Sequence, residues 1–426
     1  MKEKTQTTRL SNGLTILTEK MPDVRSATLG FWLKTGSRHE SNNLNGICHF
    51  IEHAVFKGTN RRTALDIAME IDRLGGNLDA FTSHETTGFL IKVVDRKIPE
   101  AFDLIADMIA NPRFDEKELK RERRVIFEEM KMVEDAPEEF LSELFLKDFF
   151  PAHALGLPIE GTRKTVKTFD RKTIADFHSK NYSPANIVIA CAGNVEHREI
   201  VDLTEKFFDF SQTADSREQT ASAAAPSFAA PISLKNKPNL EQAHLIIAAP
   251  WIAANDERRY AGSLLNSVLG DGNSSRLWQN VREKRGLAYS VGASVSSFED
   301  CGIFSIYAGT SPDKLAEVVD LSVAEIRRVK QKGVRIEELD LAKEQSVSAI
   351  LLGLESTSVR ADVLATSEIV FGRQISVEET LEKIENVNCE QVREIANEFF
   401  HTDKIALVAL GNLNGLKIDR ERLNVS

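Results

Sequence analysis

Residues 49–53 read HFIEH, and this stretch decides how the rest of the chain is interpreted. Turn-forming residues precede it at 45–46 (NG) and follow it at 58–60 (GTN), so the sequence predicts a short helix between them. Most of the other residues between these turns are apolar, which indicates that the helix is largely buried. Buried polar side chains need partners, and a metal ion is one such partner for histidine.

His49 and His53 are four residues apart, so in a helix they project from one face, one turn apart. Two imidazoles placed in this way can bind one divalent metal ion, and Glu52 can then act as a base on a water molecule at that ion. The order H-x-x-E-H is the reverse of the commoner H-E-x-x-H zinc signature. The alternative is a helix with two surface histidines and a glutamate.

A catalytic zinc ion usually has three protein ligands, and a predicted helix at residues 121–133 contains the best candidate for the third. Steps of three and four residues define one stripe of this helix: Glu122, Val125, Ile126, Glu129, Met132 and Val133. Glu129 lies on this apolar, inward-facing stripe, whereas Glu128 shares a face with basic residues. Glu129 is therefore the predicted ligand, and Glu122 is predicted to orient a histidine or the water. The alternative is that both glutamates pair with buried arginines.

These residues resemble the pitrilysin and mitochondrial-processing-peptidase family of inverted zincins, in its bacterial single-chain, processing-peptidase-like branch. The resemblance covers nearly the whole chain and is carried by HFIEH, FKGT, ERRVIFEEMKMVEDAPEEF, SNGLTILTEK, GSRHE, GGNLDAFTSHET and REKRGLAYSV. It implies a zinc metalloendopeptidase in which His49, His53 and Glu129 bind one zinc ion per chain. It also implies that Glu52 is the general base and that Glu122 is an accessory acidic residue.

The resemblance implies two more site residues in the second half of the chain. Arg282 and Tyr289 match a pair that completes the family's peptidase site from the half without zinc. An arginine can clamp a carbonyl or carboxylate group, and a tyrosine hydroxyl can donate to a developing oxyanion. Without the resemblance to the family, ordinary packing and a surface salt bridge would be the preferred interpretation of this pair.

A substrate-binding strand is implied at Asp79, Ala80, Phe81 and Thr82, which resemble the family's segment that pairs with an extended peptide. The family usually has asparagine at the position of Asp79. An asparagine amide can donate a hydrogen bond to a peptide carbonyl, whereas an ionised aspartate cannot. This departure puts the substrate contact of Asp79 in doubt but leaves zinc binding unaffected.

The composition excludes several other classes of protein. The chain is 42% hydrophobic and 28% charged, as is typical of soluble globular proteins, and its net charge of −10 argues against a nucleic-acid binder. No apolar run reaches the roughly 20 residues of a membrane span, and the amino terminus lacks the apolar region of a signal peptide. The four cysteines lack paired spacing, which favours free thiols in a reducing, cytoplasmic compartment.

The chain has the pattern of an internal duplication. Residues 173–194 and 391–412 each predict a helix, a turn, an apolar strand and a Gly-Asn ending, and Asp170 and Asn388 align as helix N-caps. A segment rich in Ala, Ser, Thr and Pro separates the two halves and reads as a linker. The predicted domains are a zinc-binding catalytic half (1–215), a linker (216–235) and a homologous half without zinc (236–426).

The predicted fold class is α+β, with two homologous mixed α/β halves, each a β-sheet with helices layered on one face. The resemblance implies a closed chamber built from two such chains, so we expect a homodimer, with a heterodimer with a related chain as the alternative. The expected substrates are peptides or unfolded, presequence-like polypeptides. A second possible function is a non-catalytic structural or substrate-binding subunit. Such subunits typically lose the zinc residues, which this chain retains.

Overall fold

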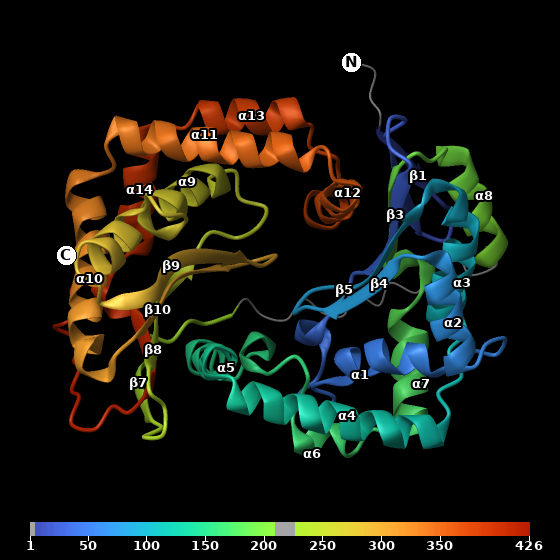
Figure 1. Cartoon of the computed structure of the whole chain (residues 1–426), viewed down its shortest axis with the longest axis horizontal. Coiled ribbons are helices and arrows are strands. Elements are labelled where there is room, and N and C mark those ends of the chain that lie inside the picture. The colour runs from blue at the N-terminus through green and yellow to red at the C-terminus, as the bar shows by residue number, and fades with distance from the viewer. Residues whose placement is uncertain (1–4, 209–225) are drawn as a thin grey trace. The chain divides into compact units, whose positions relative to one another are not determined.

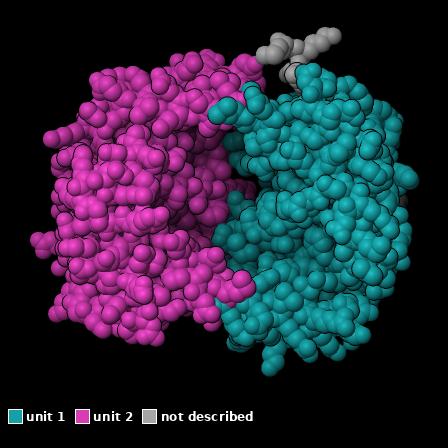
Figure 2. Space-filling view, in the orientation of Figure 1, with its two compact units in different colours: residues 1–131, 157–223, 352–374 teal, residues 132–156, 224–351, 375–426 magenta. Residues whose placement is uncertain are grey.

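The computed structural model describes residues 5–208 and 226–426, which fold into two compact units (Figure 2). Unit 1 contains residues 5–131, 157–208 and 352–374, and unit 2 contains residues 132–156, 226–351 and 375–426. Among the described residues, no helix is both long and apolar enough to cross a membrane.

Unit 1 is built on a mixed sheet of six strands with the order β1-β2-β6-β3-β5-β4, in which β2 and β6 form the parallel pair. The strands are β1 (Thr5–Arg9), β2 (Thr15–Lys20), β3 (Ser26–Leu33), β4 (Asn77–Thr82), β5 (Thr87–Val94) and β6 (Ile187–Gly193). The helices are α1 (Ile47–Ala54), α2 (Ala64–Leu74), α3 (Ile98–Ala110), most of α4 (Glu116–Asp135), α6 (Arg163–Val166), α7 (Arg171–Asn181), α8 (His197–Phe207) and α12 (Thr357–Phe371).

The hairpin of β1 and β2 forms at the Asn12-Gly13 turn, as the sequence predicts. Gly13 has a φ of +88°, a conformation that glycine adopts without steric cost. The Asn12 side chain accepts a hydrogen bond of 3.2 Å from the Leu14 amide. This local bonding is typical of asparagine in turns.

Alternation along β3 sends its side chains to two different layers. Phe31 faces the helices on one side of the sheet (Figure 1), and its ring lies 5.2 Å from that of Phe102 in α3. Trp32 faces the opposite side, where it belongs to a separate cluster with Leu364 of α12. The predicted arrangement of helices on one face is therefore incomplete, because β3 is apolar on both faces and both must be covered.

Unit 2 contains a mixed sheet of five strands with the order β7-β11-β8-β10-β9. Its strands are β7 (Ile232–Asn236), β8 (Ala243–Trp251), β9 (Ala288–Ser297), β10 (Gly302–Thr310) and β11 (Ala406–Gly411). Its helices are α5 (Pro137–Phe149), α9 (Arg259–Gly270), η7 (Trp278–Glu283, a π-helix), α10 (Leu315–Lys332), most of α11 (Ile336–Gly353), α13 (Val377–Glu385) and α14 (Cys389–Phe399).

The two sheets repeat one topology. In unit 1, β2 runs parallel to β6, and antiparallel pairs then lead through β3 and β5 to β4; in unit 2, β7, β11, β8, β10 and β9 repeat this sequence of directions. The predicted N-caps agree, because Asp170 accepts from the Thr173 amide and Asn388 accepts from the Gln391 amide. The predicted α+β fold with two mixed α/β halves is confirmed.

The compact units differ from a simple division of the chain because each half contributes one helix to the other unit. Helix α5 packs on the sheet of unit 2, where Leu141 and Phe145 share a cluster with Ile246. Helix α12 covers the free face of the unit 1 sheet. Of the predicted linker 216–235, residues 216–225 lie outside the described residues, and residues 232–235 belong to β7.

Candidate metal centre

Helix α1 presents its polar residues because its apolar residues are anchored in the core. Phe50 and Ile51 are buried in the unit 1 core, whereas His49, Glu52 and His53 are half-buried on the other side of the helix. This two-sided pattern is typical of an amphipathic helix packed on a sheet. The three polar residues of HFIEH therefore share one partly accessible face.

The start of α1 is fixed by a buried carboxylate. Glu40 accepts hydrogen bonds of 2.8 Å from both the Gly46 and the Cys48 amides, and Asn45 donates to the same carboxylate at 3.3 Å. These bonds satisfy amides that a helix N-terminus leaves without a partner. Burial raises the pKa of Glu40 to about 7. Glu40 lies in the GSRHE segment, and only its contacts reveal that it positions the helix of HFIEH.

His49, His53 and Glu129 converge on one point. Each offers a ligand atom, and these atoms all lie within 4.8 Å of one another. The rings of His49 and His53 have centroids 4.6 Å apart, and His53 Nε2 lies 3.6 Å from Glu129 Oε2. Within residues 5–208 and 226–426, this is the one group of three or more His, Cys, Asp or Glu residues that fits a metal ion.

His49 Nδ1 and Glu129 Oε2 are buried polar atoms without a hydrogen-bond partner. Buried polar atoms are normally satisfied, so these two unsatisfied atoms favour a metal-binding role for the group. Imidazole and carboxylate are the usual zinc donors in catalytic sites. Burial, followed by the nearby His53, lowers the pKa of His49 to about 4, so its ring is neutral and can donate a lone pair at neutral pH. The residues present therefore fit a zinc ion.

Glu122 holds His53 from behind. Its carboxylate lies 2.9 Å from His53 Nδ1 through one oxygen and 2.9 Å from Lys57 Nζ through the other. Although burial acts to raise the pKa of Glu122, the hydrogen bonds from His53 and Lys57 lower it, so the group is ionised and His53 is the donor. This bond turns His53 Nε2 toward Glu129, as expected of a carboxylate that orients a metal-binding histidine.

Glu52 is held by the edge strand of the sheet. The Thr82 hydroxyl, at the end of β4, donates a hydrogen bond of 2.8 Å to Glu52 Oε2. Burial raises the pKa of Glu52, while the bond from Thr82 and the charge of His53 oppose that shift. A carboxyl group whose pKa is moved toward neutrality is better suited to exchange protons.

The four predicted substrate-binding residues divide between the two faces of β4. Ala80 and Thr82 are half-buried, whereas Asp79 and Phe81 point to the exposed face. The Asn77 side chain donates to the Asp79 carboxylate on that face. Strand β4 is the last strand of its sheet, so among the described strands one of its edges is unpaired. An unpaired edge can accept an extended peptide.

Arg282 and Tyr289 lie together in unit 2. The Arg282 guanidinium is 4.0 Å from the ring of Trp278 in η7 and 4.9 Å from the ring of Tyr289 at the start of β9. Tyr289 is 77% exposed, and the Arg282 side chain is half-buried. The guanidinium is therefore oriented by stacking on two rings, and its Nε lies 4.0 Å from the Glu283 carboxylate. Their roles remain predictions.

The stripe used to choose Glu129 is only partly correct. Glu122 and Ile126 are buried, but Val125 and Met132 are largely exposed. The distinction between the two adjacent glutamates still agrees with the geometry, because Glu128 is exposed and forms an ion pair with Lys131. The sequence interpretation omitted Lys57, Glu40 and the bond from Thr82 to Glu52. Of these, only Lys57 has a spacing that indicates a place near the site, because it lies four residues after His53, within FKGT.

The mixed sheets and this convergent His-His-Glu group define a two-unit α+β protein with a candidate metal centre in its first unit. Residues 15–163 match the family model described as Insulinase (Peptidase family M16), and residues 168–346 match that of the Peptidase M16 inactive domain. The chain is 40% identical to an uncharacterized zinc protease of Streptomyces coelicolor over 92% of this chain and 86% of that protein. It is 38% identical to the uncharacterized zinc protease YmxG of Bacillus subtilis, over 93% of this chain and 96% of that protein.

The fold has close counterparts among solved structures. A protease from Helicobacter pylori superposes with a TM-score of 0.89 at 23% identity, covering 95% of this chain and 99% of that one. The Peptidase M16 inactive domain from Pseudomonas fluorescens gives a TM-score of 0.86 at 21% identity, covering 97% and 100%. The chain belongs to the M16 peptidase family, in agreement with the resemblance that its motifs carry.

Proposed function

We propose that this chain is a zinc-dependent endopeptidase, with one zinc ion per chain bound by His49, His53 and Glu129. The observation that carries the proposal is the convergence of these three ligand atoms within 4.8 Å of one another, beside a glutamate that is fixed by Thr82. Zinc in such a site lowers the pKa of a water molecule and polarises the scissile carbonyl. The zinc-protease names of the relatives support the same chemistry.

Glu52 is the proposed general base. Its carboxylate takes a proton from the attacking water and later delivers it to the leaving amine. The bond from Thr82 leaves one carboxylate oxygen, Oε1, available for this exchange. Glu122 keeps the His53 ring in one orientation and, together with Lys57, maintains a balanced pair of charges behind it.

The proposed substrates are peptides or unfolded, presequence-like polypeptides that add to the free edge of β4. Asp79, Ala80, Phe81 and Thr82 would contact them, with the side chain of Asp79 on the exposed face of the strand. A basic substrate side chain could pair with the Asp79 carboxylate. Peptide turnover by Asp79→Asn tests this contact, and an unchanged rate and preference would remove Asp79 from the binding site.

We further propose that the active form is a cytoplasmic homodimer that encloses a chamber. Arg282 and Tyr289 of one subunit would steady the tetrahedral intermediate at the zinc site of the other. The presence of both motifs in one chain favours two identical subunits over a heterodimer. Sedimentation of the purified chain tests the assembly, and a purely monomeric active enzyme would exclude it.

The alternative is a non-catalytic structural or substrate-binding subunit. The retention of all three proposed ligands and of Glu52 favours the enzyme. Measuring zinc content together with cleavage of a fluorogenic peptide distinguishes the two functions. Zinc binding without cleavage of any member of a peptide library would support the subunit role.

A further inference from the structure

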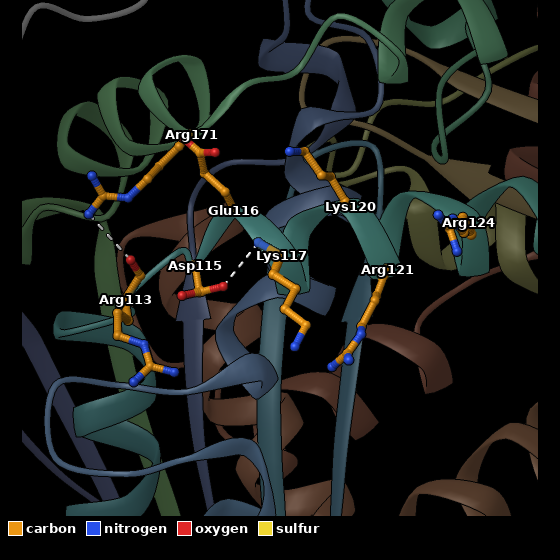
Figure 3. A pocket seen from close by; sticks show the side chains of 8 residues that line it. All are labelled: Arg113, Asp115, Glu116, Lys117, Lys120, Arg121, Arg124 and Arg171. Atoms are coloured by element: carbon orange, nitrogen blue, oxygen red, sulfur yellow. Dashed lines mark hydrogen bonds between the residues drawn. The ribbon is translucent and has the colours of Figure 1, made fainter.

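A second feature of unit 1 lies at the start of α4, and none of its lining residues is part of the proposed peptidase site. It is a cavity of about 720 Å³ whose lining side chains are all charged. Six of them are basic, contributed by the turn before α4, by α4 itself and by the start of α7 (Figure 3): Arg113, Lys117, Lys120, Arg121, Arg124 and Arg171. Tertiary folding is needed to bring these segments together.

The cavity carries a net positive charge, although the chain as a whole is negative. Its six basic residues are accompanied by two acidic ones, Asp115 and Glu116, which leaves four positive charges, whereas the chain as a whole has a net charge of −10. Like charges gathered in a concave surface repel one another and concentrate a positive potential there. An anionic ligand would relieve that repulsion.

The basic groups are available to a ligand. Arg121 forms an ion pair of 2.6 Å with Glu118. In the part of the chain that the structure describes, none of the other five basic groups lies within 4 Å of a carboxylate. Arg171 donates to the backbone carbonyls of Phe114, at 3.1 Å, and Arg113, at 3.5 Å. These bonds orient its guanidinium without neutralising it.

The chemistry of the lining selects the class of anion. Guanidinium and ammonium groups together bind phosphate oxygens, the former in a bidentate manner. The volume falls in the roughly 300–1,000 Å³ range of small-molecule sites. No aromatic or apolar side chain lines it, so it offers a nucleobase no apolar surface. Asp115 already accepts hydrogen bonds from the Lys117 and Glu118 amides of α4, so the ligand must be read by side chains.

We propose that this cavity is a binding site for small oligophosphate anions, which it recognises through their phosphate chain alone. Free inorganic triphosphate and the triphosphate of a nucleotide carry this chemistry equally. The proposal is independent of the proposed peptidase function, because none of the lining residues belongs to the His49, His53 and Glu129 group.

Isothermal titration calorimetry of the full chain with inorganic triphosphate, ATP, orthophosphate and a short DNA duplex tests the proposal. We expect triphosphate and ATP to bind with dissociation constants within about threefold of each other and orthophosphate to bind more weakly, because fewer charges are engaged. The double variant Lys120→Glu/Arg124→Glu should weaken triphosphate binding by at least about tenfold. A thermal melt confirms that the variant is folded.

Two controls make the result specific. Lys172→Glu reverses one charge next to Arg171 but outside the cavity lining, where Lys172 pairs with Asp176. It should weaken binding by less than about threefold. His49→Ala removes a proposed zinc ligand and should leave triphosphate binding unchanged, which separates the cavity from chelation of the metal.

Several outcomes would overturn the proposal. They are the absence of triphosphate binding to the wild type, an equal loss in Lys172→Glu, which would indicate diffuse surface charge, and loss of binding in His49→Ala, which would locate the anion at the metal. Markedly tighter binding of ATP than of triphosphate would show that a base is recognised. Tighter binding of duplex DNA than of triphosphate would replace the small-anion site with an extended nucleic-acid surface.

Discussion

The two units share a sheet topology but differ in one helix, which follows β3 in unit 1 and the equivalent strand β8 in unit 2. In unit 1, β3 leads to α1 with its HFIEH motif; in unit 2, β8 leads to α9, which contains neither histidine nor glutamate. Both helices bury apolar residues against their own sheet, among them Phe50 in α1 and Leu265 in α9. Packing therefore constrains only the residues on the buried side of this helix. The residues on its other side can differ between the units, and the HFIEH histidines and glutamate occur in unit 1 only.

The largest expected effect comes from Glu52, the proposed base, which has no counterpart in α9 of unit 2. Glu52→Gln should retain zinc but reduce kcat/KM for a fluorogenic peptide by about 100- to 10,000-fold, because the amide cannot accept the proton of the attacking water. Zinc content by atomic absorption and steady-state kinetics provide the measurement. Glu128→Gln, on the exposed side of α4, is the matched control and should be unaffected. Normal turnover by the zinc-loaded Glu52→Gln protein would contradict the assignment.

The second comparison is between Glu129, the proposed third zinc ligand, and its neighbour Glu128. Glu129→Gln should weaken zinc affinity by more than about 100-fold, because a ligand contributes more than a residue that merely supports one, whereas Glu128→Gln should bind zinc as the wild type does. Competition with a chromogenic chelator measures both affinities. If the two variants behaved alike, the helical register chosen for α4 would be wrong.

A smaller loss of zinc affinity is expected from a change at Lys57, which pairs with Glu122. Lys57→Met removes the cation that neutralises Glu122, so the carboxylate is less firmly held against His53. We expect zinc affinity to fall by about 10- to 100-fold, with partial recovery in Lys57→Arg. A Lys57→Met protein with the zinc affinity of the wild type would limit Lys57 to a packing role.

The contact between strand and base predicts a still smaller effect. Thr82→Val deletes the hydrogen bond to Glu52 with little change in shape, so kcat should fall by about tenfold while zinc content stays constant. Thr82→Ser retains the hydroxyl and should recover most of the activity. A change confined to KM would show that Thr82 acts on the substrate and not on Glu52.

The smallest effect probes what the units have in common. Asp170→Ala and Asn388→Ala remove equivalent N-caps, and each should lower the midpoint of thermal unfolding by about 2–4 °C. Asp170→Asn and Asn388→Asp retain a capping oxygen and should change it little. Strongly unequal effects of the two alanine substitutions would indicate that the equivalent N-caps contribute differently to the stability of the two units.

Some contacts could be read from the sequence because they depend on short spacing. The four-residue interval of His49 and His53, and the local capping at Asp170 and Asn388, follow from helical geometry. The bond from Thr82 to Glu52 joins a strand to a helix 30 residues away, so no local sequence pattern predicts it. The exposure of Val125 and Met132 was mispredicted because an apolar stripe does not reveal how much of a helix its neighbours cover.

The sequence by itself determined the fold class, the family and the helix of HFIEH, and it predicted Glu129 as a ligand, because each of these is encoded in periodicity or in contiguous motifs. The tertiary structure alone decided which segments complete each unit and which partners surround each functional group. It placed α12 on the first sheet and α5 on the second, assigned Lys57 to Glu122, and gathered six basic side chains into one cavity. These contacts join residues far apart in the chain, and only the packing of whole elements selects among the many pairings that the sequence permits.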